Sequence, residues 1–186
     1  TLSAPRKQET LMDIHCQKED LLKGVQLVQN AISPRSTLPV LANILFEATA
    51  EGLRLSSTDL EVGIRCHVKA DVKSGGVTTV PARTIGEFLR TLDDGRDVSL
   101  KMNENQKMEI RSGRDRCSLA CLPKDDYPVL PEFNIEKAIS LNHILVREMI
   151  RKTVFSVSTD ETRYVLNGVN FLMENGKITL IATDGR

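Results

Sequence analysis

Two aspartates, Asp59 and Asp184, are candidates for acid–base or metal-dependent chemistry. Each follows a threonine at the end of an alternating apolar run, in ANILFEATAEGLRLSSTDLE at 42–61 and in NGVNFLMENGKITLIATDGR at 167–186. Carboxylates can act as general bases or as metal ligands. The return of the same Thr-Asp pair after the same kind of strand favours a repeated turn instead. A hydrolase that acts on nucleotides through these two carboxylates remains an open alternative.

The other reactive side chains are scattered along the sequence. His15, His67 and His143 lie far apart. Cys117 and Cys121 would share one face of a strand about 13 Å apart, which is too far for a disulfide. Because the sequence has no secretory signal, all four cysteines, including Cys16 and Cys66, are expected to be free thiols. The sequence contains no P-loop, dinucleotide-binding or serine-hydrolase motif. It therefore predicts no catalytic residue, no metal site and no cofactor.

The basic residues are more informative. Twenty-five Lys and Arg balance 25 Asp and Glu, which argues against a strongly basic nucleic-acid binder. Basic residues nevertheless recur on the predicted helices and in one loop, at Lys18, Lys23, Arg35, Arg83, Arg90, Arg147, Arg151 and Lys152. Each alone would be an ordinary solvated side chain. As a set they predict a surface that contacts phosphates without reading base sequence and in a salt-dependent way.

Alternating strands and amphipathic helices must position these residues. Apolar residues at steps of three and four predict helices around 21–32, 85–92 and 146–154. Period-two alternation between turn residues predicts strands at 12–17, 40–49, 53–58, 62–72, 77–80, 97–102, 107–112, 115–121 and 138–141, with two more in 167–186. Both halves of the region from 12 to 121 thus consist of a strand, a helix and further strands.

The sequence also resembles itself at one constant offset. Identical residues recur 125 positions apart, as in the pairs Ile14 and Ile139, Phe46 and Phe171, and Asp59 and Asp184. A constant offset predicts a domain-scale duplication, although two such units could also resemble each other by pattern alone.

The repeat sets the expected domain boundaries. We expect one domain at 12–122, a Pro-rich linker at 123–136, and the first part of a second, truncated domain at 137–186, so that the chain would be a fragment of a longer protein. Residues 1–11 are polar and are expected to be a disordered leader or the remnant of a tag, not a signal peptide.

Several motifs, taken in order, resemble the bacterial sliding clamp family, the β subunit of DNA polymerase III. They are R-x-T-L-P-V-L-x-N-I at 35–44, L-x-L-x-x-T-D-L-E at 53–61, T-T-V-P-A-R at 78–83, I-R-S-G-R-x-R-x-S-L at 110–119, L-P-x-x-D-Y-P at 122–128, R-Y-x-L-N-G at 163–168 and A-T-D-G-R at 182–186. The resemblance implies an α+β DNA-clamp fold, built from duplicated strand–helix–strand units with helices on one face of antiparallel sheets. It implies a non-enzymatic processivity factor in the bacterial cytoplasm.

The resemblance also implies partners and site residues. The family forms a head-to-tail homodimeric ring around double-stranded DNA and binds the DNA polymerase, the clamp loader and other proteins that carry a clamp-binding motif; no membrane contact is expected. The implied DNA-facing residues are Lys23, Arg35, Arg83 and Tyr164. The implied peptide pocket includes Arg163, Leu166, Thr183, Gly185 and Arg186, and the implied dimer interface includes Arg114, Arg116, Cys117 and Leu119.

Three departures from the family pattern qualify this interpretation. Cys117 stands where an aromatic residue is familiar, and Val165 stands where a second tyrosine can occur. Asp160 and Glu161, just before Arg163, bring negative charge near the expected DNA-facing side. A tandem-repeat interaction module without a DNA role is the alternative function.

Overall fold

The computed structural model describes residues 10–32, 38–131, 136 and 138–186. The chain divides into two compact units: unit 1 extends to Pro131 and unit 2 begins at Glu132. Arg35, one of the predicted DNA-facing residues, lies outside the described residues. Among the helices that are described, none combines the length and apolar character needed to cross a membrane.

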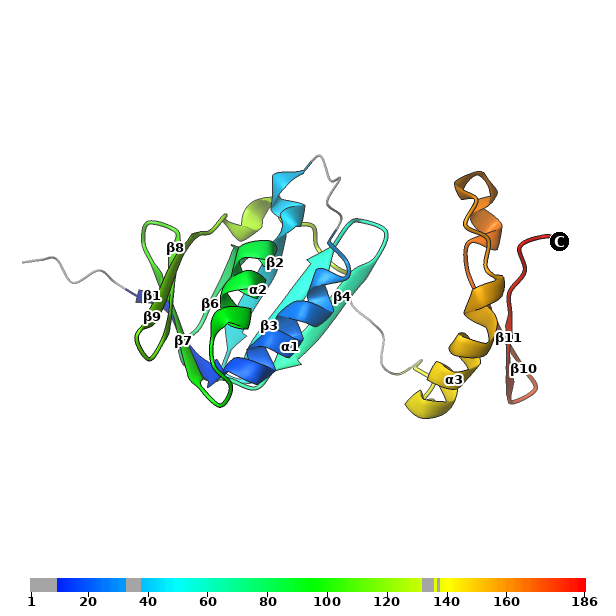
Figure 1. The fold of residues 1–186 in the computed structure, drawn as a ribbon, viewed down its shortest axis with the longest axis horizontal. Coiled ribbons are helices and arrows are strands. Elements are labelled where there is room, and N and C mark those ends of the chain that lie inside the picture. The colour runs from blue at the N-terminus through cyan, green and yellow to red at the C-terminus, as the bar shows by residue number, and fades with distance from the viewer. Residues whose placement is uncertain (1–9, 33–37, 132–135, 137) are drawn as a thin grey trace, which may run out of the picture. The chain divides into compact units, whose positions relative to one another are not determined.

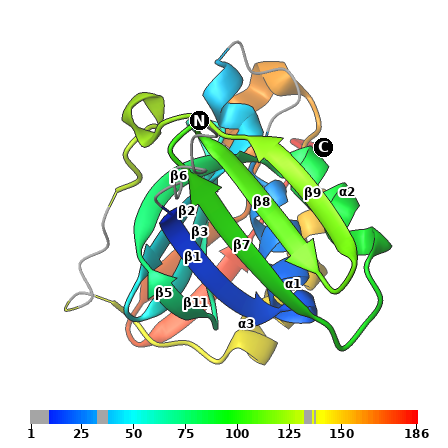
Figure 2. The same cartoon turned by 90° about the vertical axis from the view of Figure 1, so that its left-hand side faces the viewer.

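Unit 1 contains two antiparallel sheets (Figures 1 and 2). In the larger sheet the strands lie in the order β5-β1-β7-β8-β9, and in the smaller one in the order β4-β3-β2-β6. The strands are β1 (Thr10–Gln17), β2 (Asn43–Thr49), β3 (Gly52–Thr58), β4 (Gly63–Val68), β5 (Asp71–Ser74), β6 (Gly76–Pro81), β7 (Asp97–Asn103), β8 (Lys107–Ser112) and β9 (Asp115–Ala120).

The two halves of unit 1 exchange their first strands. β1 belongs to the first half but pairs with β7 of the second half, with Ile14 opposite Leu100. β6 opens the second half but pairs with β2 of the first half, with Val80 opposite Ile44. All four of these residues are fully buried in one hydrophobic core. The exchange therefore joins both halves into a single folding unit.

Two helices cover the same side of this core. Figure 1 shows α1 (Lys18–Gln29) and α2 (Ala82–Thr91) side by side across one face of the four-stranded sheet, as the sequence predicts. α1 buries Leu21, Val25 and Val28, and α2 buries Ile85 and Leu89. Since each helix begins at the residue after an exchanged strand, the strands fix where the helices start.

Gly24 allows α1 to approach β4 closely. A Cβ atom at this position would lie 2.5 Å from Val68 Cγ2 and 3.0 Å from Leu55 Cδ1. Both neighbours are buried, so they have little room to move. The helix therefore packs through its backbone at this point.

Unit 2 repeats part of this arrangement. It contains α3 (His143–Thr153), two short 3₁₀ segments (Val154–Ser156 and Glu161–Leu166), and the hairpin of β10 (Asn170–Glu174) and β11 (Lys177–Ile181). Asn170 pairs with Ile181 and Glu174 with Lys177. Their counterparts 125 positions earlier, Leu45 with Ser56 and Thr49 with Gly52, also pair. The duplication predicted from sequence therefore extends to the strand register.

The structure corrects three predicted strands. The run at 40–49 is a strand only from Asn43 onward, because its first residues belong to a 3₁₀ helix, Pro39–Ala42. The run at 62–72 is not one strand: it divides into β4 and β5, which lie in different sheets. No strand forms at 138–141. The counterpart of this segment is β1, which needs both β5 and β7 as neighbours. In unit 2 the described strands are β10 and β11, which pair with each other. Because a strand requires a backbone partner, the alternation of apolar and polar residues at 138–141 was not enough to form a strand.

The close packing at Gly24 leads to a stability prediction. We expect Gly24→Ala to lower the free energy of unfolding by up to about 2 kcal/mol, because overpacking costs about 1–3 kcal/mol and only roughly 1 kcal/mol of this is offset by the helix propensity that alanine gains over glycine. Urea unfolding followed by circular dichroism measures this. Gln26→Ala, on the exposed side of the same helix, is the control and should stay within about 0.5 kcal/mol of wild type. A more stable Gly24→Ala protein would contradict the packing argument.

Candidate functional site

The two Thr-Asp pairs form the same turn, as their repetition predicts. In unit 1 the Thr58 hydroxyl accepts the Leu60 N–H at 3.0 Å, and Asp59 Oδ1 accepts the Glu61 N–H at 3.0 Å. In unit 2 the Thr183 hydroxyl accepts the Gly185 N–H at 3.0 Å, and Asp184 Oδ1 accepts the Arg186 N–H at 3.0 Å. Leu60 and Gly185 both have a φ of +83°.

This geometry gives Asp59 a structural role. Its carboxylate also accepts the Val62 N–H at 2.7 Å. The backbone N–H groups of Val62 and Glu61 lower the pKa of Asp59, whereas a general base working near neutral pH needs a raised pKa. The turns therefore supply no support for the hydrolase alternative.

The helical surface of unit 1 carries fewer free cations than the sequence suggests. Lys23 on α1 and Arg83 and Arg90 on α2 are exposed, as predicted. Lys18 is instead 5% exposed, and its ammonium group donates to Asp94. The inclusion of Lys18 in a cationic surface was wrong, because the loop before β7, far away in sequence, brings a carboxylate onto the start of α1.

Carboxylates also lie near two of the remaining cations, Arg83 and Lys23. Arg83 Nε donates to Glu87 Oε1 at 2.8 Å, one turn along α2, and this bond raises the pKa of Arg83. Asp20 is exposed on α1, one turn before Lys23. A phosphate that contacts Arg83 would therefore compete with Glu87 for the same guanidinium.

In unit 2 the predicted pocket residues gather around one turn. A Cβ atom added to Gly185 would lie 3.3 Å from Arg163 Nη1 and 3.4 Å from Leu166 Cδ1. Thr183 closes the turn that holds Gly185, and Arg186 follows it. The guanidinium of Arg163 lies 3.8 Å from Asp160, so the acid noted in the sequence does reach it. Arg163, Leu166 and Gly185 thus form one contiguous surface, which we call the Gly185 surface.

Tyr164, the predicted DNA-facing residue of unit 2, is 80% exposed in the 3₁₀ segment that also holds Arg163 and Leu166. A ring so exposed is free to stack on another group. The carboxylate of the preceding Asp160 accepts the Thr162 N–H, which ties down the start of this segment.

The predicted dimer residues lie at a sheet edge. β9 is the last strand of the larger sheet in the described part of unit 1, so one side of its backbone has no neighbouring strand there. Arg114 and Arg116 are exposed, and Cys117 is half-buried. The side chain of Leu119 is only 5% exposed and belongs to the core. Leu119 could therefore reach a partner only through its backbone.

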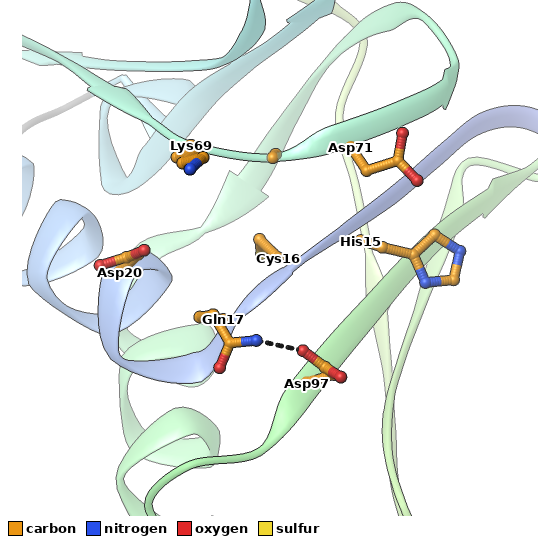
Figure 3. Close-up of a pocket in the computed structure, with 8 residues that line it drawn as sticks. His15, Cys16, Gln17, Asp20, Lys69, Asp71 and Asp97 are labelled. Atoms are coloured by element: carbon orange, nitrogen blue, oxygen red, sulfur yellow. Dashed lines mark hydrogen bonds between the residues drawn. The ribbon is translucent and has the colours of Figure 1, made fainter.

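One hollow was not foreseen from the sequence. A space of about 590 Å³ lies where the chain passes from β4 to β5 beside β1, and it is lined by His15, Cys16, Gln17, Asp20, Lys69, Ala70, Asp71 and Asp97 (Figure 3). Gln17 donates to Asp97 within it. Its charges are of both signs, and nowhere in the described residues do three His, Cys, Asp or Glu side chains gather as a metal site would require. No sequence motif could have indicated it, because its residues come from four separate segments.

Comparison with known proteins agrees with this architecture. Residues 12–131 match the DNA polymerase III beta subunit, N-terminal domain, and residues 140–186 match its central domain. A beta sliding clamp from Caulobacter vibrioides is 37% identical over 94% of this chain and 48% of its own length. Crystal structures of sliding clamps from Bartonella birtlesii (TM-score 0.86, 32% identity, 94% and 47% of the two chains) and Pseudomonas aeruginosa (TM-score 0.84, 34% identity, 94% and 47%) are similar in fold; both were solved bound to griselimycin.

The fold, with paired antiparallel sheets and helices on one face, is that of the DNA sliding clamps. The chain belongs to the DNA polymerase III beta subunit family. It spans about half the length of the curated relatives that it matches.

The role assigned to Asp59 leads to a pH prediction. Because its folded-state pKa is lowered, Asp59 stabilises the fold above its ordinary pKa of 3.8, and this contribution is lost as the pH falls through the lowered value. We expect the stability difference between wild type and Asp59→Asn to shrink between about pH 5 and pH 2. Carbon-detected NMR titration of Asp59 together with urea unfolding measures both quantities. A measured pKa above 3.8 would restore the possibility of a catalytic carboxylate.

Proposed function

We propose that this chain is part of a DNA sliding clamp, a non-enzymatic processivity factor that encircles duplex DNA and tethers the replicative polymerase. The observation that carries the proposal is the match of both units to consecutive domains of the beta subunit family. Acting on the chromosome, the protein would work in the bacterial cytoplasm.

The charge of the helical surface supports a ring that slides. A clamp that surrounds DNA is held by topology, so its phosphate contacts need only be weak. Lys23 and Arg83 are exposed on neighbouring helices, and Arg83 already shares its charge with Glu87. Contacts of this kind are independent of base sequence and easily exchanged. Together with Arg35 and Tyr164, they form the DNA-facing set of this proposal.

The Gly185 surface is proposed to bind the clamp-binding segments of partner proteins, including the polymerase and the clamp loader. Arg163 supplies a cation, Leu166 is a half-buried apolar residue, and Gly185 lies close to both without a side chain that would cover them. Such a combination suits an extended peptide with an apolar anchor. Griselimycin was found bound to two relatives, and we propose that it binds this surface and can serve as its probe.

The edge of β9 is proposed to pair with a second copy of the full-length protein, closing a head-to-tail ring. An edge strand with free backbone groups readily accepts another strand. Arg114 and Arg116 would flank this junction, and Cys117 would pack within it.

A loading experiment tests the proposed function. The full-length protein is loaded on nicked circular DNA with a clamp loader and ATP, isolated by gel filtration, and the circle is then linearised. We expect protein to remain on circles and to run off linear DNA, because retention is topological. Equal retention, or equal loss, on both forms would reject the clamp and favour an interaction module.

A charge-removal variant tests the DNA-facing surface. We expect the Lys23→Ala, Arg83→Ala double variant of the full-length protein to bind a short duplex more weakly than wild type does. The plot of the logarithm of the binding constant against the logarithm of the salt concentration has a negative slope. This slope should become less steep by about 0.9 for each phosphate that the variant no longer neutralises, because fewer counterions are then released on binding. Fluorescence anisotropy at several salt concentrations measures this slope.

The matched control removes two cations from the opposite side of the core. Lys107 and Arg111 are exposed on β8, whose intervening residues Met108 and Ile110 are buried. Lys107→Ala, Arg111→Ala should leave the salt slope unchanged, and both variants should bind griselimycin as wild type does. Loss of griselimycin binding in the Lys23, Arg83 variant would contradict the assignment of separate surfaces.

A further inference from the structure

The side chain of Asn167 links three points of the backbone that precedes it in unit 2. Its amide nitrogen lies 3.1 Å from the carbonyl oxygens of Ser158 and Asp160 and 3.3 Å from the carbonyl oxygen of Arg163. Three acceptors around one end of the amide fix its orientation, because only the nitrogen can donate to them. The two N–H groups of the amide are thus shared among three carbonyl groups.

The backbone that Asn167 contacts is a closed loop with a kink. The Ser158 N–H donates to the Leu166 carbonyl at 2.9 Å and so joins the two ends of residues 158–167, which we call the Asn167 loop. Within it the 3₁₀ segment is interrupted at Arg163, where φ is −108° and ψ is 54°. A kink breaks the regular series of backbone hydrogen bonds, so a side-chain donor such as the Asn167 amide can take their place.

Unit 1 holds the corresponding segment in another way. At the 125-residue offset Asn167 corresponds to Ala42, whose side chain has no donor. The two residues before it, Val40 and Leu41, are buried. Val165, the counterpart of Val40, is instead 72% exposed. Burial holds this segment in unit 1, whereas in the described part of unit 2 the Asn167 amide supplies polar bonds.

The Asn167 loop bears two of the three residues of the Gly185 surface. A Cβ atom at Gly185 would lie 3.3 Å from Arg163 Nη1 and 3.4 Å from Leu166 Cδ1. The Asn167 amide bonds the carbonyl of Arg163 itself, and also that of Asp160, whose carboxylate lies 3.8 Å from Arg163 Nε. The same amide therefore restrains the guanidinium group and the acid beside it.

We infer that Asn167 is a positioning residue for the Gly185 surface: its amide sets the loop so that Arg163 and Leu166 stand next to Gly185. This role rests on the proposed peptide-binding function of that surface. Asn167 acts through the backbone of the loop rather than through contact with the partner peptide.

Asn167→Asp in the full-length protein tests this role, because it keeps the size of the side chain and removes both N–H groups. Near neutral pH the new carboxylate would face three carbonyl oxygens, which repel it. We expect griselimycin to bind the variant about tenfold more weakly than wild type, since hydrogen bonds are replaced by repulsion. Isothermal titration calorimetry, well below the unfolding temperature of each protein, measures the affinity. A residue that only stabilised the fold would leave the affinity of the folded protein unchanged.

The pH dependence of the loss adds a second readout. Carbonyl oxygens favour the neutral form of the introduced carboxyl group and raise its pKa, and once protonated it donates to one of them. The affinity relative to wild type should therefore partly recover as the pH falls from about 7 to about 5. Asp160 stays ionised in this range, because its bonds with Thr162 lower its pKa, and Arg163 stays charged. Unchanged affinity, or a loss that does not vary with pH, would overturn the inference.

Asn170→Asp is the matched control. Asn170 is exposed on β10, three residues along the chain, and the substitution adds the same charge. It should bind griselimycin as wild type does at every pH. An equal loss in this variant would mean that charge, not the missing amide, had weakened binding, and would also overturn the inference.

Hydrogen–deuterium exchange of wild type with griselimycin separates this inference from the proposed function. We expect protection at 163–166 and at 183–186. Wild type without protection there would reject the proposed peptide surface and the role of Asn167 with it. Protection in wild type together with unaltered binding by Asn167→Asp would overturn the role of Asn167 alone.

Discussion

Backbone pairing between the two halves of unit 1 is the constraint on which the rest of the structure depends. A strand must have hydrogen-bonding neighbours, and β1 finds its neighbours in β5 and β7, while β6 finds one in β2. Neither half can complete its sheet alone. Because α1 follows β1 directly and α2 follows β6 directly, the exchanged strands also fix the two helices side by side. The surface that bears Lys23 and Arg83 is a consequence of this pairing.

The same pairing also determines which cations of this chain, whose net charge is zero, are left exposed for contact with DNA. The start of α1 meets the loop before β7, where the Lys18 N–H donates to the Arg96 carbonyl at 2.9 Å and the Lys18 ammonium donates to Asp94. This junction buries the Lys18 side chain, which is therefore absent from the exposed cationic surface. Of the cations that remain exposed, Arg83 donates to Glu87, and Asp20 lies one turn before Lys23. Weak, shared charges of this kind favour contacts with phosphates that form and break readily, which suits sliding better than tight binding.

Duplication gave the chain two copies of one turn, which differ in their third residue. Thr58 with Asp59 and Thr183 with Asp184 build the turn in both units. The residues that follow, Leu60 and Gly185, have the same backbone conformation. The shared hydrogen bonds maintain the fold of the turn, whichever residue stands third.

The amino-acid sequence by itself determined the features that depend on local order. Apolar periodicity located α1, α2 and α3, and the repeated Thr-Asp pair indicated turns, because both follow from interactions within a few residues. The 125-residue repeat predicted a duplication, and the structure adds that the β10–β11 hairpin has the register of β2 and β3. Only tertiary structure decided which strands become neighbours, so alternation misjudged 62–72 and 138–141. It also decided that Lys18 and Leu119 are buried, since burial depends on residues such as Asp94 that are remote in sequence and adjacent only after folding.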